Sequence, residues 1–136
     1  AGIEIENSFR ADVYENVATK NTGGILIFDL PNLPQQGGHQ VRVFNNEVFD
    51  NDTPNFAPEG NIVGSVPKGT GVMVMANTDV EVFNNTITNH ATVGILIARY
   101  PNDFDDDQYQ PVPRRVHVHN NVIVHSGFAP DDQLYS

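Results

Sequence analysis

Hydrophobic and polar side chains alternate in short segments along this chain, and one type of segment recurs four times. It is a glycine followed by alternating apolar residues, and its copies read GIEI, GILI, GVMV and GILI. The copies begin at Gly2, Gly24, Gly71 and Gly94. Alternation with a period of two is typical of β-strands, because successive side chains of a strand point to opposite faces. The pattern therefore predicts short strands, and no segment shows the periodicity expected of a helix.

A second recurring segment follows each glycine segment. It is Val-x-Val, then an aromatic residue or histidine, then Asn-Asn, and it reads VRVFNN, VEVFNN and VHVHNN from Val41, Val80 and Val116. A degenerate first copy, ADVYEN, keeps Val13 and Asn16 in register. A further short apolar strand is predicted after each Asn pair. Every unit is therefore expected to contain three short strands.

Units of about 22 residues that are built from strands and turns are typical of solenoids. The sequence predicts an all-β fold, a right-handed single-stranded parallel β-helix of about four coils with three short strands per coil. Residues 1–136 are expected to form a single domain. The predicted coils are roughly 1–23, 24–70, 71–93 and 94–136. The predicted loop insertions, which flank the first sheet, are 29–38, 53–69 and 100–113.

The asparagines after the second strand stand where the chain must turn sharply. Asparagine tolerates the left-handed backbone conformation and bonds to nearby backbone groups. When identical residues stack in register, their side chains can also pass hydrogen bonds from one strand to the next. We predict an internal asparagine ladder of this kind. Its members are Asn16, Asn46, Asn85 and Asn121.

Two further ladders are predicted on the outer face of the second strand. One joins charged side chains whose sign alternates from coil to coil, and the other stacks aromatic rings. Such ladders stabilise a stack of coils, and the alternative for the rings is a platform on which sugars stack. The charged set is Asp12, Arg42, Glu81 and His117, and the ring set is Tyr14, Phe44, Phe83 and His119.

The outward-facing positions of the first strand are apolar in three of the four copies. Exposed apolar stripes of this size usually mark a ligand or partner surface. The neighbouring loops are rich in Pro, Gly and Asn, and they could instead cover the stripe by folding back Phe56, Ile62, Val63 and Val66. Both readings are open at this point. The stripe consists of Leu26, Phe28, Met73, Met75 and Leu96.

One stretch of the sequence, NDFDDDQ, is a candidate calcium site. Calcium binds several carboxylate and carbonyl oxygens, but the spacing of this stretch does not match an EF-hand. The alternative is a solvated acidic loop. The candidate ligands are Asp103, Asp105, Asp106 and Asp107.

The histidines of the last repeat, HVHNNVIVH, are a second candidate metal site. His117 and His119 lie two residues apart and are expected on one face of a strand. Such a pair can bind Zn²⁺, but a third ligand is required and none is apparent from the sequence. The alternative is that both histidines belong to the two ladders.

Charge and composition exclude several classes of partner. The chain has 7 basic and 17 acidic residues and a formal net charge of −10. Nucleic acids and anionic membranes attract clusters of Lys and Arg, so neither is expected as a partner. The chain has no cysteine and no apolar run long enough to span a membrane. It has no nucleotide-binding or nucleophile motif, and no cofactor is expected apart from calcium.

The segments NTGGILIFDLP and NFAPEGNIVG, together with the repeats around them, resemble bacterial right-handed parallel β-helix repeat proteins of the pectate-lyase-like superfamily. More narrowly, they resemble an uncharacterised, generally exported subfamily whose members are usually longer. The resemblance implies a periplasmic or extracellular location, a chain that is a stretch of a longer one, and polysaccharide as a partner.

Enzymes of that superfamily are mostly polysaccharide lyases, hydrolases and epimerases, with sites on the outer face of the first sheet. Its lyases use calcium held by Asp or Glu together with an Arg or Lys base. In this sequence the corresponding face is apolar, and Arg99 and Asp105 are the catalytic candidates. Fold alone does not establish an activity.

The leading hypothesis is a non-catalytic β-helix module of an exported protein, with a structural or carbohydrate-binding role. The alternative is a carbohydrate-active enzyme, a lyase or epimerase acting on uronic-acid polymers. Solenoids need polar capping ends, and neither end of this sequence has the character of a cap. The sequence therefore also predicts a homo-oligomer formed through uncapped coil ends.

Overall fold

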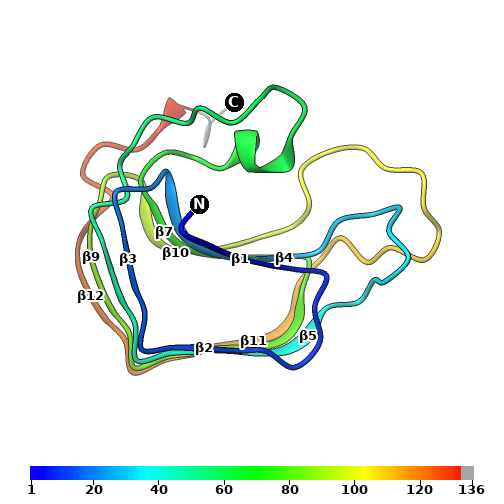
Figure 1. Cartoon of the computed structure of the whole chain (residues 1–136), viewed down its shortest axis with the longest axis horizontal. Coiled ribbons are helices and arrows are strands. Elements are labelled where there is room, and N and C mark those ends of the chain that lie inside the picture. The colour runs from blue at the N-terminus through cyan, green and yellow to red at the C-terminus, as the bar shows by residue number, and fades with distance from the viewer. Residues whose placement is uncertain (133–136) are drawn as a thin grey trace.

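Three parallel sheets wind through the chain, and each sheet takes one strand from every coil. A computed structural model describes residues 1–132, and within these residues there are twelve strands, β1 to β12. Figure 1 looks along the stack of coils, so that the strands of one sheet lie behind one another. Sheet A contains β1 (Ile3–Glu6), β4 (Gly23–Phe28), β7 (Thr70–Met75) and β10 (Val93–Ala98). Sheet B contains β2 (Asp12–Tyr14), β5 (His39–Phe44), β8 (Thr78–Phe83) and β11 (Arg114–His119). Sheet C contains β3 (Val17–Thr19), β6 (Glu47–Phe49), β9 (Thr86–His90) and β12 (Val122–Ser126).

Equivalent residues of the repeats are register partners in these sheets. Ile25 of β4 pairs with Ile3 of β1 on one side and with Val72 of β7 on the other. The predicted all-β fold, a parallel β-helix of about four coils with three strands each, is thereby confirmed. The predicted fourth coil reaches residue 136, and its residues 133–136 lie outside the described residues.

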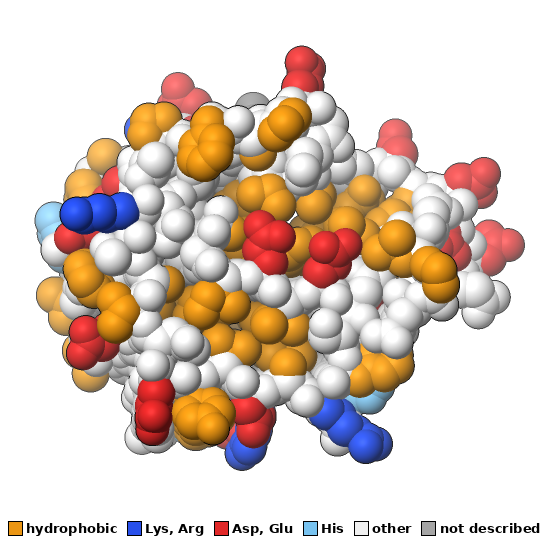
Figure 2. Space-filling view, viewed as in Figure 1, with side chains coloured by type: hydrophobic (Ala, Val, Ile, Leu, Met, Phe, Trp, Pro, Cys, Tyr) orange, Lys and Arg blue, Asp and Glu red, His pale blue; other side chains and the backbone are white. Residues whose placement is uncertain are grey.

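The interior of the stack is filled by the inward-facing side chains that the alternation predicts. Figure 2 looks onto one end of the stack and shows hydrophobic side chains in the space that the sheets enclose. In the last described coil, the inward-facing Ile97, Val118 and Ile123 are exposed. Association through such open coil ends stays a prediction. The buried interior residues are Val13, Ala18, Ile25, Ile27, Val41, Val43, Val48, Val72, Val74, Val80, Val82 and Ile87.

The glycines at the start of the sheet A strands are required because neighbouring coils approach closely there. A Cβ on Gly24 would lie 2.6 Å from the carbonyl oxygen of Gly71 and 2.6 Å from Cγ1 of Val48. A Cβ on Gly71 would collide with the carbonyl oxygen of Gly94. Such separations are far below van der Waals contact. The recurring glycine is therefore a requirement of packing between coils.

The two asparagines of each Asn-Asn pair have different roles. The first adopts the left-handed backbone conformation, with φ of 56° at Asn45, 54° at Asn84 and 56° at Asn120. This conformation turns the chain from sheet B into sheet C, and asparagine adopts it at lower cost than most residues. The second asparagine of each pair supplies the ladder.

The ladder runs through all four coils. Nδ2 of Asn46 donates a hydrogen bond to Oδ1 of Asn85 over 3.0 Å, and Nδ2 of Asn85 donates to Oδ1 of Asn121 over 3.0 Å. Asn16 donates to Asn46 in the same way over 3.1 Å. The remaining amide hydrogen of Asn85 is donated to the carbonyl oxygen of Val43, so the buried side chains are satisfied. The predicted ladder of Asn16, Asn46, Asn85 and Asn121 is confirmed.

A second ladder, which the sequence did not predict, lies at the turn from sheet C to sheet A. Nδ2 of Asn21 donates to Oδ1 of Asn51 over 3.1 Å, and Nδ2 of Asn51 donates to Nε2 of His90 over 3.0 Å. The residue before each member, Lys20, Asp50 or Asn89, has φ between 55° and 61°. The turn from sheet B to sheet C and the turn from sheet C to sheet A are therefore built on the same plan.

The outer face of sheet A forms a second hydrophobic cluster, because three connecting segments of the chain fold over it. These segments are 29–38, 50–69, which contains a short 3-10 helix (Ile62–Ser65), and 99–113. Figure 1 shows them on the outer side of sheet A and at its right-hand end. The side chains that cover the sheet are Leu30, Ile62, Val66, Tyr100 and Tyr109.

Candidate functional site

A groove lies between strand β1 and the segment 50–69, on the outer side of sheet A. Its volume is about 460 Å³, and a second hollow of about 400 Å³ shares Ala57 and Asn61 with it. In Figure 2, Asp and Glu side chains lie beside hydrophobic ones in the region between sheet A and the covering segments. The floor and walls include Phe28, Leu30 and Ile62. The groove is therefore a depression that combines apolar side chains with acidic groups at one side.

The acidic groups are the carboxylates of Glu4 and Glu6. Both residues are exposed, and they alternate along β1 with the inward-facing Ile3 and Ile5, so they project from the same face. Their register partners on β4 are Leu26 and Phe28, which are buried beneath the covering segments. Both carboxylates are acceptors for hydrogen bonds from a ligand in the groove.

Phe56 stands at the rim of the groove and is 87% exposed. Its segment is held by side-chain hydrogen bonds. Nδ2 of Asn55 donates to the carbonyl oxygens of Val63 and Val66, and Oδ1 of Asn55 accepts from the amide of Ala57. The expectation that Phe56 folds back over the stripe is therefore wrong, whereas Val66 is buried against the stripe.

The apolar stripe on sheet A is not open to a ligand or partner in this structure. Its members Leu26, Phe28, Met73 and Met75 are at most 5% exposed, and Leu96 is partly buried. The hydroxyl of Tyr109 donates to the carbonyl oxygen of Asp29 over 2.7 Å and fixes one of the covering segments. The reading of the stripe as a ligand or partner surface is corrected accordingly, because segments of the same chain bury it.

The acidic stretch lies in the segment 99–113. Asp103, Asp105 and Asp107 are exposed, and Asp106 is partly buried. Oδ2 of Asp106 accepts from the amide of Asn32 over 2.7 Å and from Nε2 of Gln36, which joins two covering segments. These hydrogen bonds hold the pKa of Asp106 below its usual value. Asp106 thus has a structural contact of its own, and calcium binding by the stretch stays a prediction.

The two catalytic candidates are not brought together. Arg99 is exposed and lines a small cavity of about 150 Å³ with Met73, Met75 and Leu96. Among residues 1–132, no ion pair joins Arg99 to Asp105. A catalytic role for this pair stays a prediction.

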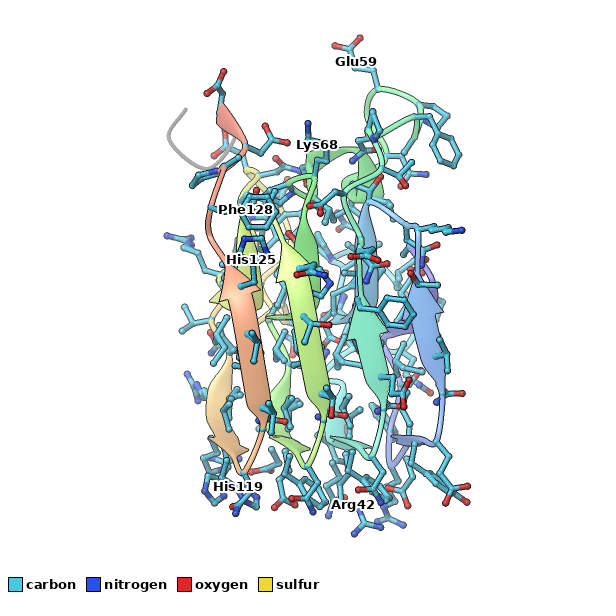
Figure 3. All side chains as sticks on the ribbon, turned by 90° about the vertical axis from the view of Figure 1, so that its left-hand side faces the viewer. Arg42, Glu59, Lys68, His119, His125 and Phe128 are labelled. Atoms are coloured by element: carbon cyan, nitrogen blue, oxygen red, sulfur yellow. The ribbon has the colours of Figure 1, made fainter. Side chains whose placement is uncertain are left out.

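The outer face of sheet B carries the predicted ring ladder and one contact of the predicted charged ladder. The rings of Tyr14, Phe44, Phe83 and His119 stack with centroids 5.0, 5.0 and 5.1 Å apart and nearly parallel planes. In the charged ladder, Arg42 forms an ion pair with Asp12 at 2.8 Å. Glu81 bonds to His119 rather than to its register partner His117. In Figure 3, Arg42 and His119 lie at the same lower edge of the molecule.

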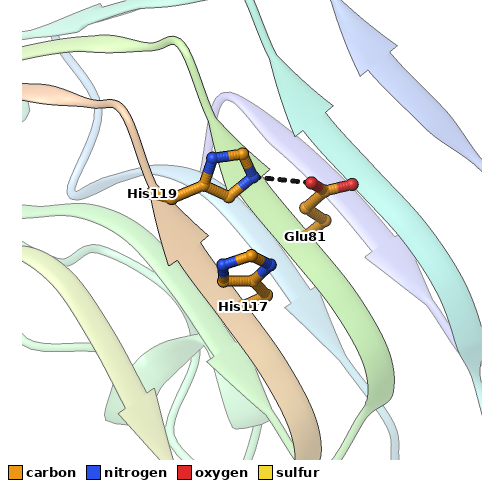
Figure 4. Close-up of side chains that lie close together, drawn as sticks. All are labelled: Glu81, His117 and His119. Atoms are coloured by element: carbon orange, nitrogen blue, oxygen red, sulfur yellow. Dashed lines mark hydrogen bonds and ion pairs between the residues drawn. The ribbon is translucent and has the colours of Figure 1, made fainter.

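Glu81, His117 and His119 form a close cluster on this face (Figure 4). Each of the three side chains offers one ligand atom, and these atoms all lie within 4.8 Å of one another. Among the described residues, this is the group of His, Asp and Glu side chains close enough together to share a metal ion. Nε2 of His119 lies 2.6 Å from Oε2 of Glu81. Hydrogen bonds to Asn120 and to Glu81 raise the pKa of His119.

Sequence reasoning missed Glu4, Glu6 and Phe56 as a group, and it missed Glu81 as a third side chain beside the histidines. The signal for Glu81 was present, because the repeats place it one coil below His117. No such signal existed for Phe56, whose position depends on how an irregular segment packs.

In residues 1–132, no helix is long and apolar enough to cross a membrane.

Comparison with known proteins relates part of the chain to a family. No curated protein and no solved structure matches the chain. A family model described as disaggregatase related, of a family of the β-helix type, matches residues 75–135, so the later coils of this stack are similar to that family.

Proposed function

We propose that this chain is a non-catalytic β-helix module of an exported protein, and that it binds a carbohydrate in the groove beside β1. The observation that carries the proposal is the exposed ring of Phe56 at the rim of a groove that also presents Glu4 and Glu6. The C–H face of a sugar stacks on an aromatic ring, and its hydroxyls donate to carboxylates. A volume of about 460 Å³ is within the usual range of small-molecule sites.

The charge of the groove favours a neutral sugar. Two carboxylates and a net charge of −10 repel a polymer of uronic acids. A neutral glycan meets no such repulsion, and its hydroxyls are matched by acceptor groups. The pocket and the hollow next to it give room for more than one sugar ring.

Family resemblance supports the wider proposal. We place the chain in the pectate-lyase-like superfamily and in the periplasm or outside the cell, on the resemblance of its repeats and loop segments. Residues 75–135 match a family described as disaggregatase related, and a binding module is compatible with that match.

A glycan array followed by calorimetry tests the proposal. The 136-residue chain is expected to retain neutral polysaccharides in preference to polyuronates, and Phe56→Ala is expected to weaken binding at least about tenfold without loss of stability. Phe128→Ala is the matched control, because Phe128 is also exposed and stacks on His125 of sheet C, away from the groove. The proposal would be contradicted if the wild type and Phe56→Ala bound the glycan equally well, or if the array retained no glycan. The chain would then have a structural role.

The second candidate function is a polysaccharide lyase or epimerase acting on uronic-acid polymers. It is favoured by the position of the groove on the outer face of the first sheet, where enzymes of the resembled superfamily have their sites. An absorbance assay for unsaturated uronates, with and without Ca²⁺, tests the lyase. Product formation that is lost in Arg99→Ala would favour this candidate over the binding module.

A further inference from the structure

We infer that Glu81, His117 and His119 form a binding site for one divalent transition-metal ion, such as Zn²⁺, on the outer face of sheet B (Figure 4). His117 and His119 are on β11, two residues apart, and Glu81 is on β8 directly beside them. This site is separate from the groove and does not depend on the proposed function.

The three side chains converge because the strands hold them in register. His117 is the register partner of Glu81, and His119 is the partner of Phe83. The ring of His119 stacks on Phe83 at 5.1 Å, and the ring of His117 stacks on His119 at 4.3 Å. A site on paired strands has a more rigid backbone than one on loops, so the three side chains start from fixed positions next to one another.

The distances allow a shared ion after a small movement. Zinc binds histidine nitrogen and carboxylate oxygen at about 2.1 Å, so two such ligands at a tetrahedral angle lie roughly 3.4 Å apart. Nε2 of His119 and Oε2 of Glu81 are 2.6 Å apart, and the nearest ligand atom of His117 is within 4.8 Å of both. To bind one ion, Nε2 of His119 and Oε2 of Glu81 must separate by roughly 1 Å or less. The ring of His117 reaches the ion by a rotation of its exposed side chain.

Neighbouring residues support the site as outer-sphere partners do in metalloproteins. Nδ1 of His119 donates to Oδ1 of Asn120 over 2.7 Å, which fixes the ring and directs Nε2 toward Glu81. A bound metal ion takes the place of the proton between Nε2 and Glu81, and that proton leaves to water. Arg42 does not compete for Glu81, because its guanidinium forms a two-bond ion pair with Asp12 at 2.8 and 2.9 Å.

The donor set selects the class of metal. Two imidazoles and one carboxylate suit zinc and related transition metals, whereas magnesium and calcium prefer sites made of oxygen. Glu81 and His119 are about one-third exposed and His117 is exposed, so water completes the coordination. The net charge of −10 draws cations toward the surface.

Calorimetric titration of the 136-residue chain with Zn²⁺ in a buffer that does not bind zinc tests the inference. We expect one ion per chain, and Glu81→Gln, His117→Gln and His119→Gln are each expected to weaken binding at least about tenfold. His125→Gln is the matched control, since His125 lies on sheet C, away from His119, and is expected to leave affinity unchanged (Figure 3). Unchanged affinity in His117→Gln and Glu81→Gln, or no binding at millimolar Zn²⁺, would overturn the inference.

A second measurement separates loss of the site from loss of structure. In ¹H–¹⁵N spectra of the histidine rings, Zn²⁺ is expected to shift the signals of His117 and His119 and to leave those of His39 and His125 in place. Since His117 is exposed, His117→Gln is expected to keep the circular dichroism of the wild type. Shifts confined to His39 or His125 would place zinc elsewhere and contradict the site.

Discussion

Asn51 donates a hydrogen bond from Nδ2 to Nε2 of His90 over 3.0 Å, and both side chains are fully buried. Nε2 must be unprotonated to accept this bond, so the neutral ring carries its proton on Nδ1. Within the described residues, Nδ1 has no hydrogen-bond partner. Burial lowers the pKa of His90, with a smaller opposing effect of Asp52 and Asp50. The stability of the second ladder therefore depends on pH through the protonation of His90.

The first prediction follows from the direction of this pKa shift. The pKa of His90 is lower in the folded state than its unfolded value of about 6.5. Below about pH 6.5, the unfolded state therefore binds more protons at this residue than the folded state does. The stabilisation of the fold by the neutral His90 ring is fully present above that pH. It is lost as the pH falls toward the folded pKa, by at most about 1.4 kcal/mol of unfolding free energy per pH unit.

Urea unfolding at several pH values, compared between wild type and His90→Asn, measures this contribution. Asparagine at this position continues the ladder and does not titrate, so the wild type is expected to lose stability faster than the variant on acidification. His125→Asn removes an exposed histidine from the neighbouring strand of the same sheet and serves as the control. Parallel curves for wild type and His90→Asn would contradict the prediction.

The second prediction concerns the first ladder. Asn85→Ala removes the partner of the Asn46 amide, of the Asn46 side chain and of the Val43 carbonyl. Leaving such buried groups unpaired is expected to lower the free energy of unfolding by about 3 kcal/mol or more. Asn16→Ala, at the partly exposed end of the ladder, is expected to cost about 1 kcal/mol. Urea denaturation of both variants gives the comparison, and equal losses would contradict a dependence on burial.

The third prediction concerns the glycine column. In Gly71→Ala the new methyl group meets the carbonyl oxygen of Gly94 and lies 3.0 Å from Cγ2 of Ile87. Overpacking of this kind is expected to lower the free energy of unfolding by at least about 2 kcal/mol. Gly60→Ala is the control, because its φ of 89° is unfavourable for alanine but the space around it is open. The control is expected to cost about 1 kcal/mol in thermal or urea unfolding, and a larger loss in Gly60→Ala than in Gly71→Ala would contradict the packing argument.

The fourth prediction concerns the covered apolar stripe. Tyr109→Ala removes a ring that packs over sheet A, and it is expected to cost about 3 kcal/mol and to increase the fluorescence of a dye that binds exposed apolar surface. Tyr109→Phe keeps the ring and loses the hydrogen bond to Asp29, so a loss of about 1 kcal/mol and no added fluorescence are expected. If Tyr109→Ala binds no more dye than Tyr109→Phe, other residues keep the stripe closed.

Local pattern was enough to predict the coils. Ile25, Ile27, Val41 and Val43 are buried because alternation puts them on the inner face of their strands, and that information lies in neighbouring residues. The ladder at Asn46 was also predictable, since identical residues recur at equivalent positions. The second ladder escaped notice because one of its members is His90 rather than asparagine.

The sequence by itself determined the repeat, the three sheets and the faces of their strands, because side-chain alternation and turn residues act over a few neighbouring positions. Only the tertiary structure decided what lies over sheet A. The burial of Met73, the exposure of Phe56 and the contact of Glu81 with His119 arise between residues far apart in the chain. The covering segments do not repeat, so nothing in their local pattern fixes how they pack, and the packing free energy of the whole molecule selects their positions.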